Sequence, residues 1–192
     1  DWADRRFDAY VERTAGRPLA IGEIHPWEAL AVGAALAFLA FLLVLATNRT
    51  AILLSVPALA ITIVYPFFKR FFVLPQAFLG IASSLGIPMA YAAVHDAVPA
   101  IAWWLLLLNL LWVVAYDTEY AMVDRDDDLR LGLPTSAITL GRYDVPAVMA
   151  SYGAMLAILS FLGMDLEFGW PYFVGLMVAW GLVAYHWWLI RT

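Results

Sequence analysis

Six apolar stretches are the feature that most constrains the fold of this chain. They cover residues 29–46, 51–68, 71–94, 97–116, 145–164 and 168–190. A helix needs about 20 largely apolar residues to cross a bilayer, and its backbone must satisfy its own hydrogen bonds there. The sequence therefore predicts an all-α, polytopic transmembrane helical bundle with six full spans. Prolines in or near these runs predict kinks or breaks, and Pro66 predicts that the second span ends near Tyr65.

The overall composition agrees with a membrane protein. Apolar residues make up 64% of the chain and charged residues 14%, whereas a soluble domain is about half apolar and a quarter charged. The chain has no cysteine, which excludes disulfide frameworks and thiolate-bound metals. Its histidines show no paired metal-ligand spacing, which argues against zinc. A net charge of −5 argues against nucleic acid as a partner.

The distribution of charge predicts a topology. If the spans alternate in direction, ten of the 11 Lys and Arg residues lie on one side of the membrane, and only Arg49 lies on the other. The positive-inside rule places the basic side in the cytoplasm. Thirteen of the 16 acidic residues fall on that same side. Acidic residues do not set topology, so their concentration there needs another cause.

Two acidic stretches on that side share a helical spacing of carboxylates. In DWADRRFD the spacing i, i+3, i+7 joins Asp1, Asp4 and Asp8. In YDTEYAMVDRDDD the spacing i, i+7, i+11 joins Asp117, Asp124 and Asp128. On a helix each set would lie on one face, where like charges repel and a hard cation such as Mg²⁺ would relieve the repulsion. Two opposed faces could hold two Mg²⁺ ions bridged by a diphosphate. The alternative is a solvated charge run at the membrane surface.

The segments that contain these motifs resemble the UbiA superfamily of membrane prenyltransferases. The resemblance is collinear over essentially the whole chain and rests on residues 1–18 (DWADRRFDAYVERTAGRP), 65–80 (YPFFKRFFVLPQAFLG) and 112–132 (WVVAYDTEYAMVDRDDDLRLG). The acids of the family's first motif, N-D-x-x-D-x-x-x-D, are matched by Asp1, Asp4 and Asp8. Its second motif, D-x-x-x-D, is matched by Asp124 and Asp128. The family has nine transmembrane helices, so the resemblance implies a single transmembrane prenyltransferase domain over residues 1–192 that is incomplete at both termini.

The resemblance also implies a chemistry. Enzymes of this family join an allylic polyprenyl diphosphate to an aromatic acceptor. It implies Mg²⁺ as cofactor, with ligands from Asp1, Asp4, Asp8, Asp124 and Asp128. The residues expected to act in catalysis are Asp4, Asp8, Asp124, Asp128 and Arg70. Lys69 and Arg70 are expected to contact the diphosphate, unless they serve only as ordinary positive-inside anchors.

Further polar and aromatic residues are candidates for binding the substrates. Arg5 either pairs with the neighbouring acids or binds the carboxylate of the acceptor. Tyr120, with Tyr116 and Trp112, either lines an apolar cavity that protects an allylic cation or simply packs. Asn109 bridges helices or faces the site, and Asp117 is a candidate for the base that removes the ring proton. Gln76, directly after Pro75, either caps a broken helix or helps to hold the diphosphate.

The second motif favours one acceptor within the family. The string YDTEYAMVDRDDD favours 4-hydroxybenzoate, which implies ubiquinone biosynthesis in a bacterial inner membrane with the site facing the cytoplasm. The expected partners are therefore polyprenyl diphosphate, 4-hydroxybenzoate and the lipid bilayer. The alternatives are homogentisate or dihydroxynaphthoate as acceptor, or a cation-coupled membrane transporter. Against a transporter, the acids cluster at one surface rather than at mid-membrane, and no inverted repeat is visible.

Overall fold

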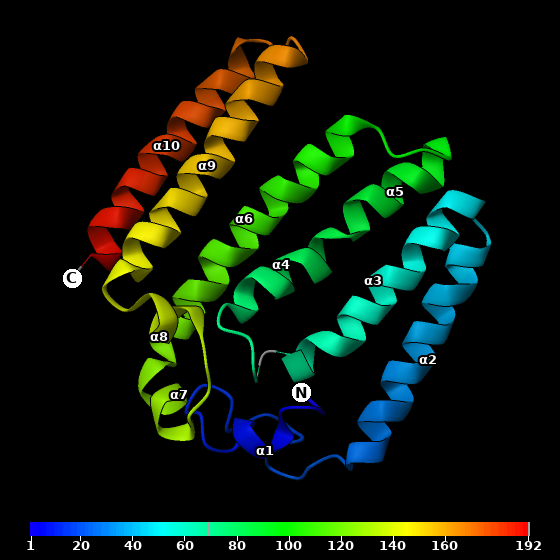
Figure 1. The fold of residues 1–192 in the computed structure, drawn as a ribbon, viewed down its shortest axis with the longest axis vertical. Coiled ribbons are helices and arrows are strands. Elements are labelled where there is room, and N and C mark those ends of the chain that lie inside the picture. Colours follow the sequence, from blue (N-terminus) through cyan, green and yellow to red (C-terminus); the bar gives the residue numbers. More distant parts are fainter. Residues whose placement is uncertain (69, 192) are drawn as a thin grey trace.

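The computed structural model describes residues 1–68 and 70–191, and the described part of the chain is helical without strands (Figure 1). The long helices are α2 (Pro26–Leu45), α3 (Arg49–Phe68), α4 (Pro75–Ser84), α5 (Gly86–His95), α6 (Ala100–Val123), α9 (Asp144–Asp165) and α10 (Trp170–Ile190). The short ones are α1 (Arg5–Asp8), α7 (Arg125–Leu131), α8 (Ser136–Leu140) and the 3-10 turn η1 (Gly141–Tyr143). The all-α class is confirmed.

The long helices pack as a fan in chain order. α2 contacts α3, α3 contacts α4 and α5, these contact α6, and α9 lies between α6 and α10. Figure 1 shows α2 at one edge of the fan and α10 at the other, with α1, α7 and α8 gathered at one end. Within the described chain, six segments are long and apolar enough to cross a membrane. The six predicted spans are therefore confirmed, and the acidic stretches lie together at one end of the bundle.

The turn between α2 and α3 shows how local sequence ends one span and begins the next. The side-chain oxygen of Asn48 accepts a hydrogen bond from the backbone N–H of Ala51 at 3.0 Å, which satisfies one of the free donors at the start of α3. The Asn48 side-chain nitrogen donates to the carbonyl oxygen of Ala92 at 2.5 Å. One side chain thus caps α3 and ties it to α5.

The prolines interrupt one span near a predicted place and fail to interrupt another. The second span was expected to end near Tyr65, but α3 continues through Pro66 to Phe68. A helix that crosses a membrane tolerates proline because leaving the helical conformation would expose still more backbone groups to lipid. The third span is instead divided at Leu85 into α4 and α5.

The two acidic stretches are not the continuous helices that their spacing suggested. In the first, the helix α1 is only four residues long and begins at Arg5, so Asp1 and Asp4 lie outside it. In the second, α6 ends at Val123, and Asp124 separates it from α7. The expectation of one continuous helix for each stretch is therefore wrong. The short helices α1 and α7, which carry acids of the two stretches, lie at the same end of the bundle (Figure 1).

A close contact between α4 and α6 fixes the centre of the fan. A Cβ atom added at Gly80 would lie 3.1 Å from Leu110 Cγ and 3.2 Å from its carbonyl oxygen. The absence of a side chain therefore lets the two helices approach closely, as small residues do in membrane bundles. One turn further along, Asn109 Nδ2 donates to Ser84 Oγ at 2.9 Å. This contact holds α6 against the end of α4.

Candidate active site

A cavity of about 190 Å³ opens at the end of the bundle where the two acidic stretches meet. Its wall brings together the N-terminal segment, the end of α3, the start of α4, the end of α6 and the loop before α8. The carboxylates that line it are Asp4, Asp8, Asp117, Asp124 and Asp128. The arginines that line it are Arg13, Arg17 and Arg70. Acidic and basic groups from distant parts of the sequence thus share one small volume.

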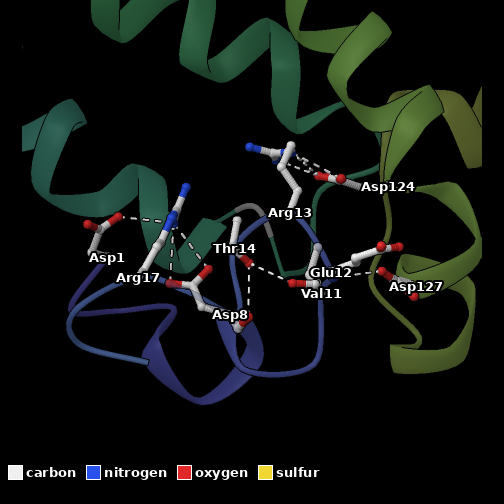
Figure 2. A network of polar contacts seen from close by, with 9 residues as sticks. All are labelled: Asp1, Asp8, Val11, Glu12, Arg13, Thr14, Arg17, Asp124 and Asp127. Atoms are coloured by element: carbon white, nitrogen blue, oxygen red, sulfur yellow. Dashed lines mark hydrogen bonds and ion pairs between the residues drawn. The ribbon is translucent and has the colours of Figure 1, made fainter. Parts of the chain in front are cut away.

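Arg13 joins the N-terminal segment to the second acidic motif (Figure 2). Its Nη2 lies 2.5 Å from Asp124 Oδ2, and its Nε donates to Asp124 Oδ1 at 3.1 Å. The side chain of Asp124 is only 13% exposed, and charge-assisted two-point contacts of this kind are among the stronger hydrogen bonds in proteins. The same hydrogen bond raises the pKa of Arg13 above its ordinary value. Arg13 therefore remains a cation beside the carboxylate.

Arg17 makes the corresponding contact with the first acidic motif. Its Nη1 lies 3.1 Å from Asp8 Oδ1 and 3.0 Å from Asp1 Oδ1. The hydroxyl of Thr14 donates to the carbonyl oxygen of Asp8 at 3.0 Å. Figure 2 shows these side chains in one network, in which the segment after α1 passes between both acidic stretches. The loop that carries Arg13 and Arg17 therefore balances the charge of both motifs.

Arg70 reaches the cavity from the segment between α3 and α4. Its Nη2 donates to the carbonyl oxygen of Ala3 at 2.6 Å. Its guanidinium lies 5.3 Å from the ring centre of Phe7 and 5.8 Å from that of Phe67. The Arg70 Nε atom is buried and has no hydrogen-bond partner within residues 1–68 and 70–191. The other predicted diphosphate ligand, Lys69, lies outside the described residues.

The structure gathers some of the predicted site residues and leaves others outside. Asp4, Asp8, Asp124, Asp128, Arg70, Asp117 and Tyr120 all line the cavity. Asp1, Arg5 and Asn109 do not line it: Asp1 pairs with Arg17, and Asn109 bridges α6 to α4. Arg5 stacks on Trp2 at 4.6 Å and donates to the carbonyl oxygen of that residue.

The aromatic residues predicted on α6 form a row. The rings of Trp112 and Tyr116 meet at 63°, with centroids 5.2 Å apart, and the Tyr116 ring lies edge-on to Tyr120. Only Tyr120 of these three lines the cavity, where the guanidinium of Arg13 lies 5.1 Å from its ring centre. The row therefore reaches the cavity at its last member.

Sequence reasoning missed the two arginines that hold the acidic motifs. Arg13 and Arg17 entered the prediction only as cytoplasmic charges. The signal that could have found them is their spacing of four residues directly after the first acidic motif. The pairing of Arg13 with Asp124 could not be read from the sequence, because more than 100 residues separate the two and only the fold brings them together.

The donor chemistry of the cavity suits a hard cation, although the side chains do not form a closed metal cage. Within the described chain, no group of three or more His, Asp or Glu side chains is placed to hold a metal ion by itself. Mg²⁺ is usually held by one or two carboxylates together with water and substrate phosphates. Carboxylates from two sides of one cavity fit that kind of site.

Comparison with known proteins places these features in a family. Residues 1–192 match the UbiA prenyltransferase family. The 4-hydroxybenzoate octaprenyltransferase of Cupriavidus necator is 58% identical over 191 residues, which is 100% of this chain and 67% of that protein. The protein of the same name from Cupriavidus metallidurans is 56% identical, over 100% of this chain and 65% of its own length. The chain thus spans about two thirds of the length of these curated relatives.

Solved structures share the fold. The apo structure of a UbiA homologue from Aeropyrum pernix K1 has a TM-score of 0.83 and 31% identity, and the match covers 98% of this chain and 73% of that one. A UbiA homologue from Archaeoglobus fulgidus bound to GPP and Mg²⁺ has a TM-score of 0.69 and 18% identity, covering 99% of this chain and 68% of that one. The second likeness concerns the fold alone.

Proposed function

Because this chain belongs to the UbiA prenyltransferase family, we propose that it carries out the reaction named for its curated relatives. The reaction transfers a polyprenyl group from an allylic polyprenyl diphosphate to 4-hydroxybenzoate, at the ring carbon ortho to the hydroxyl, in ubiquinone biosynthesis. The observation that carries this proposal is the cavity in which both acidic motifs meet three arginines. Full-length coverage of the chain by relatives of that name, at 56–58% identity, supports the choice of acceptor.

The cavity residues suit the bond-breaking step. The allylic C–O bond breaks, and the diphosphate leaves with the bonding electrons. Cationic groups placed where this negative charge develops lower the barrier. Arg70 presents a guanidinium between two aromatic rings, and a guanidinium can bind phosphate oxygens at two points. Arg13 and Arg17 lie in the same cavity and can turn toward the diphosphate when their carboxylate partners acquire another cation.

The bond-making step needs a region that excludes water. The ring carbon of the acceptor attacks the allylic cation, a C–C bond forms, and the ring proton is then lost. Phe7, Tyr65 and Tyr120 line the cavity and offer π faces that stabilise a cation without reacting with it. Asp117 lines the same cavity and remains our candidate for the proton acceptor.

A magnesium ion fits the acidic side of the cavity. Asp4, Asp8, Asp124 and Asp128 are the residues that would hold it, because their carboxylates line one wall region from two separate motifs. The chemistry that bound Mg²⁺ supplies is neutralisation of the departing diphosphate. Asp1 lies outside the lining and is 57% exposed, so we do not assign it as a ligand in this proposal. A protein of the same fold has been solved with GPP and Mg²⁺.

Product formation tests the proposal directly. Membranes that contain the full-length protein are given a polyprenyl diphosphate, 4-hydroxybenzoate and Mg²⁺, and 3-polyprenyl-4-hydroxybenzoate is measured by mass spectrometry. We expect product in the wild type, and its loss with EDTA and in Asp124→Asn. Consumption of the diphosphate with homogentisate or dihydroxynaphthoate alone would overturn the acceptor. No consumption with any acceptor, by folded protein, would overturn the reaction.

We also propose that the cavity faces the cytoplasm across a bacterial inner membrane. The loops at the cavity end carry the predicted excess of Lys and Arg, whereas the α2–α3 turn at the far end carries Arg49. Single cysteines introduced at Asp126 and at Thr47 test this orientation, since the described sequence has no cysteine of its own. An impermeant thiol reagent added to intact cells should label the Thr47 site alone, and the reverse result would overturn the orientation.

A further inference from the structure

A single side-chain amide is buried in the wall of the cavity. Gln76 is the second residue of α4, directly after Pro75, and it is 5% exposed. It lines the cavity together with the carboxylates and arginines described above. Buried side-chain amides in folded proteins nearly always have hydrogen-bond partners for both of their ends. The partners of Gln76 therefore show which end of its amide is used within the protein and which end is available to a ligand.

The oxygen end of this amide has a fixed partner in α8. The backbone N–H of Ser136 donates to Gln76 Oε1 at 3.0 Å. Ser136 is itself held, because its hydroxyl lies 2.8 Å from the hydroxyl of Thr118 on α6, and both residues are 1% exposed. A backbone N–H can only donate, so it determines which end of the amide is the oxygen. Three helices thus set the orientation of the Gln76 amide.

The nitrogen end of the amide faces the cavity without a protein partner. Within residues 1–68 and 70–191, Gln76 Nε2 has no hydrogen-bond acceptor. It is not sealed inside the protein either, since the buried side-chain atoms without partners in that part of the chain are Arg70 Nε and Arg125 Nε. Two N–H donors are therefore presented to the cavity by a side chain that cannot turn away. Such an arrangement favours a ligand that accepts hydrogen bonds.

We propose that Gln76 is a substrate-binding residue, whose Nε2 donates to an anionic oxygen of the bound substrate. The oxygen belongs to the diphosphate or to the carboxylate of the aromatic acceptor, so this inference rests on the proposed function. Two features select an anionic oxygen. The amide lies in the first turn of α4, where the helix dipole and free N–H groups favour negative charge. Arginines in the same cavity add positive potential.

A neutral donor has a distinct use in this cavity. Arg13 and Arg17 are engaged with Asp124 and Asp8, so their hydrogen bonds to a substrate compete with carboxylates of the protein itself. The Gln76 amide carries no charge and has no such competitor among the described residues. It can therefore hold an anionic oxygen before and after the arginines change partners.

Exchange of the amide for a carboxylate tests the proposal in the full-length protein. Gln76→Glu keeps the size of the side chain and an acceptor for the Ser136 N–H, but it replaces both donors with negative charge. We expect the KM of one substrate to rise at least tenfold. Thr62→Val serves as the isosteric control, because the Thr62 hydroxyl donates to the Ala58 carbonyl oxygen of its own helix and Thr62 does not line the cavity. Both KM values within twofold of wild type, in folded Gln76→Glu, would overturn the proposal.

Two inhibitors identify the source of the oxygen. Inorganic diphosphate mimics the leaving group, and benzoate mimics the acceptor without its hydroxyl. If Gln76 binds the diphosphate, Gln76→Glu should raise the inhibition constant of inorganic diphosphate at least tenfold and leave that of benzoate unchanged. If Gln76 binds the carboxylate, the opposite pattern is expected. Unchanged constants for both inhibitors would count against any contact with the amide.

A measurement on the wild type keeps the proposal testable if the variant does not fold. The protein is labelled with ¹⁵N in its glutamine side chains, and inorganic diphosphate with Mg²⁺ or 4-hydroxybenzoate is added. The Gln76 amide signals should shift with one of these additions. If no glutamine amide signal moves with either, the proposal is overturned. This readout does not require turnover, so an inactive wild type would overturn the proposed function while the amide contact is still tested.

Discussion

Two polar clusters lie at the same end of α6 and differ in what surrounds them. The first cluster lies on one side of the C-terminal end of α6 and lines the cavity with Asp117, Tyr120 and Asp124. Glu119 lies on the opposite face, where its Oε1 is 2.9 Å from Nε2 of His186 on α10. The ring of Tyr152 on α9 packs edge-on against that His186 ring, with centroids 5.9 Å apart. The first cluster lines an open cavity, whereas the residues of the second pack against one another between helices.

This difference teaches that residue type does not distinguish a site from a helix contact. Both clusters contain a carboxylate, a basic partner and a tyrosine. Glu119 and His186 satisfy each other between packed helices, as polar pairs in membrane bundles do. Arg13 and Arg17 come from a loop beside an open cavity, so a bound ligand has room to take over their contacts with the carboxylates. We therefore expect changes in the first cluster to affect activity and changes in the second to affect stability.

The largest effect is expected at Asp124. Asp124→Asn keeps the shape of the side chain but removes the charge that pairs with Arg13 and that would hold Mg²⁺. We expect the rate of product formation to fall about 100-fold or more, with little change in melting temperature. Asp165→Asn, an exposed change at the far end of α9, is the matched control. A full rate in Asp124→Asn would remove the second acidic motif from the mechanism.

A smaller loss of activity is expected at Arg13. Arg13→Gln removes the cation that balances Asp124, and we expect a decrease of about tenfold in kcat/KM for the polyprenyl diphosphate, the loss of one charge-assisted contact. Arg13→Lys should recover part of it, because lysine restores the charge but not the two-point geometry. Steady-state kinetics over a range of diphosphate concentrations measures both variants. Equal kcat/KM values for the wild type, Arg13→Gln and Arg13→Lys would show that Arg13 has only a structural role in positioning the loop.

The opposite pattern is expected in the second cluster. Glu119→Ala removes the partner of His186 between α6 and α10 and should lower the free energy of unfolding by about 1 kcal/mol, as for other polar contacts between membrane helices. Activity for each folded molecule should stay within twofold. Thermal unfolding in detergent gives the stability, and the product assay gives the activity. A large loss of activity in stable Glu119→Ala protein would break the distinction between the two clusters.

The smallest effect is expected at Asp1. This residue matches a family motif, yet its side chain is 57% exposed and forms its ion pair with Arg17 at the edge of the network (Figure 2). Exposed ion pairs contribute about 0–1 kcal/mol. Asp1→Asn should therefore change kcat/KM by less than about twofold, measured beside Asp8→Asn, for which a much larger loss is expected. Equal losses in both variants would make Asp1 a metal ligand after all.

Hydropathy predicted the spans more reliably than spacing predicted the acidic motifs. All six spans were found because a segment that crosses a bilayer needs about 20 largely apolar residues, and this requirement can be read directly from the sequence. The continuous helices expected for the acidic stretches were wrong, since α1 is one turn long and α6 ends before Asp124. Spacing assumes a continuous helix, and it contains no information on a long-range contact such as that of Arg13 with Asp124.

The sequence by itself determined the class of fold, the gathering of charges at one end of the spans, and the resemblance of the motifs to a family. These properties follow from composition, from segment length and from short strings of residues, all of which are local. Only the tertiary structure decided which charges meet, that Asp1 and Asn109 lie outside the cavity lining, and that the Gln76 amide faces inward. Those outcomes depend on how α4, α6 and α8 pack against one another, and packing joins residues that the chain order keeps apart.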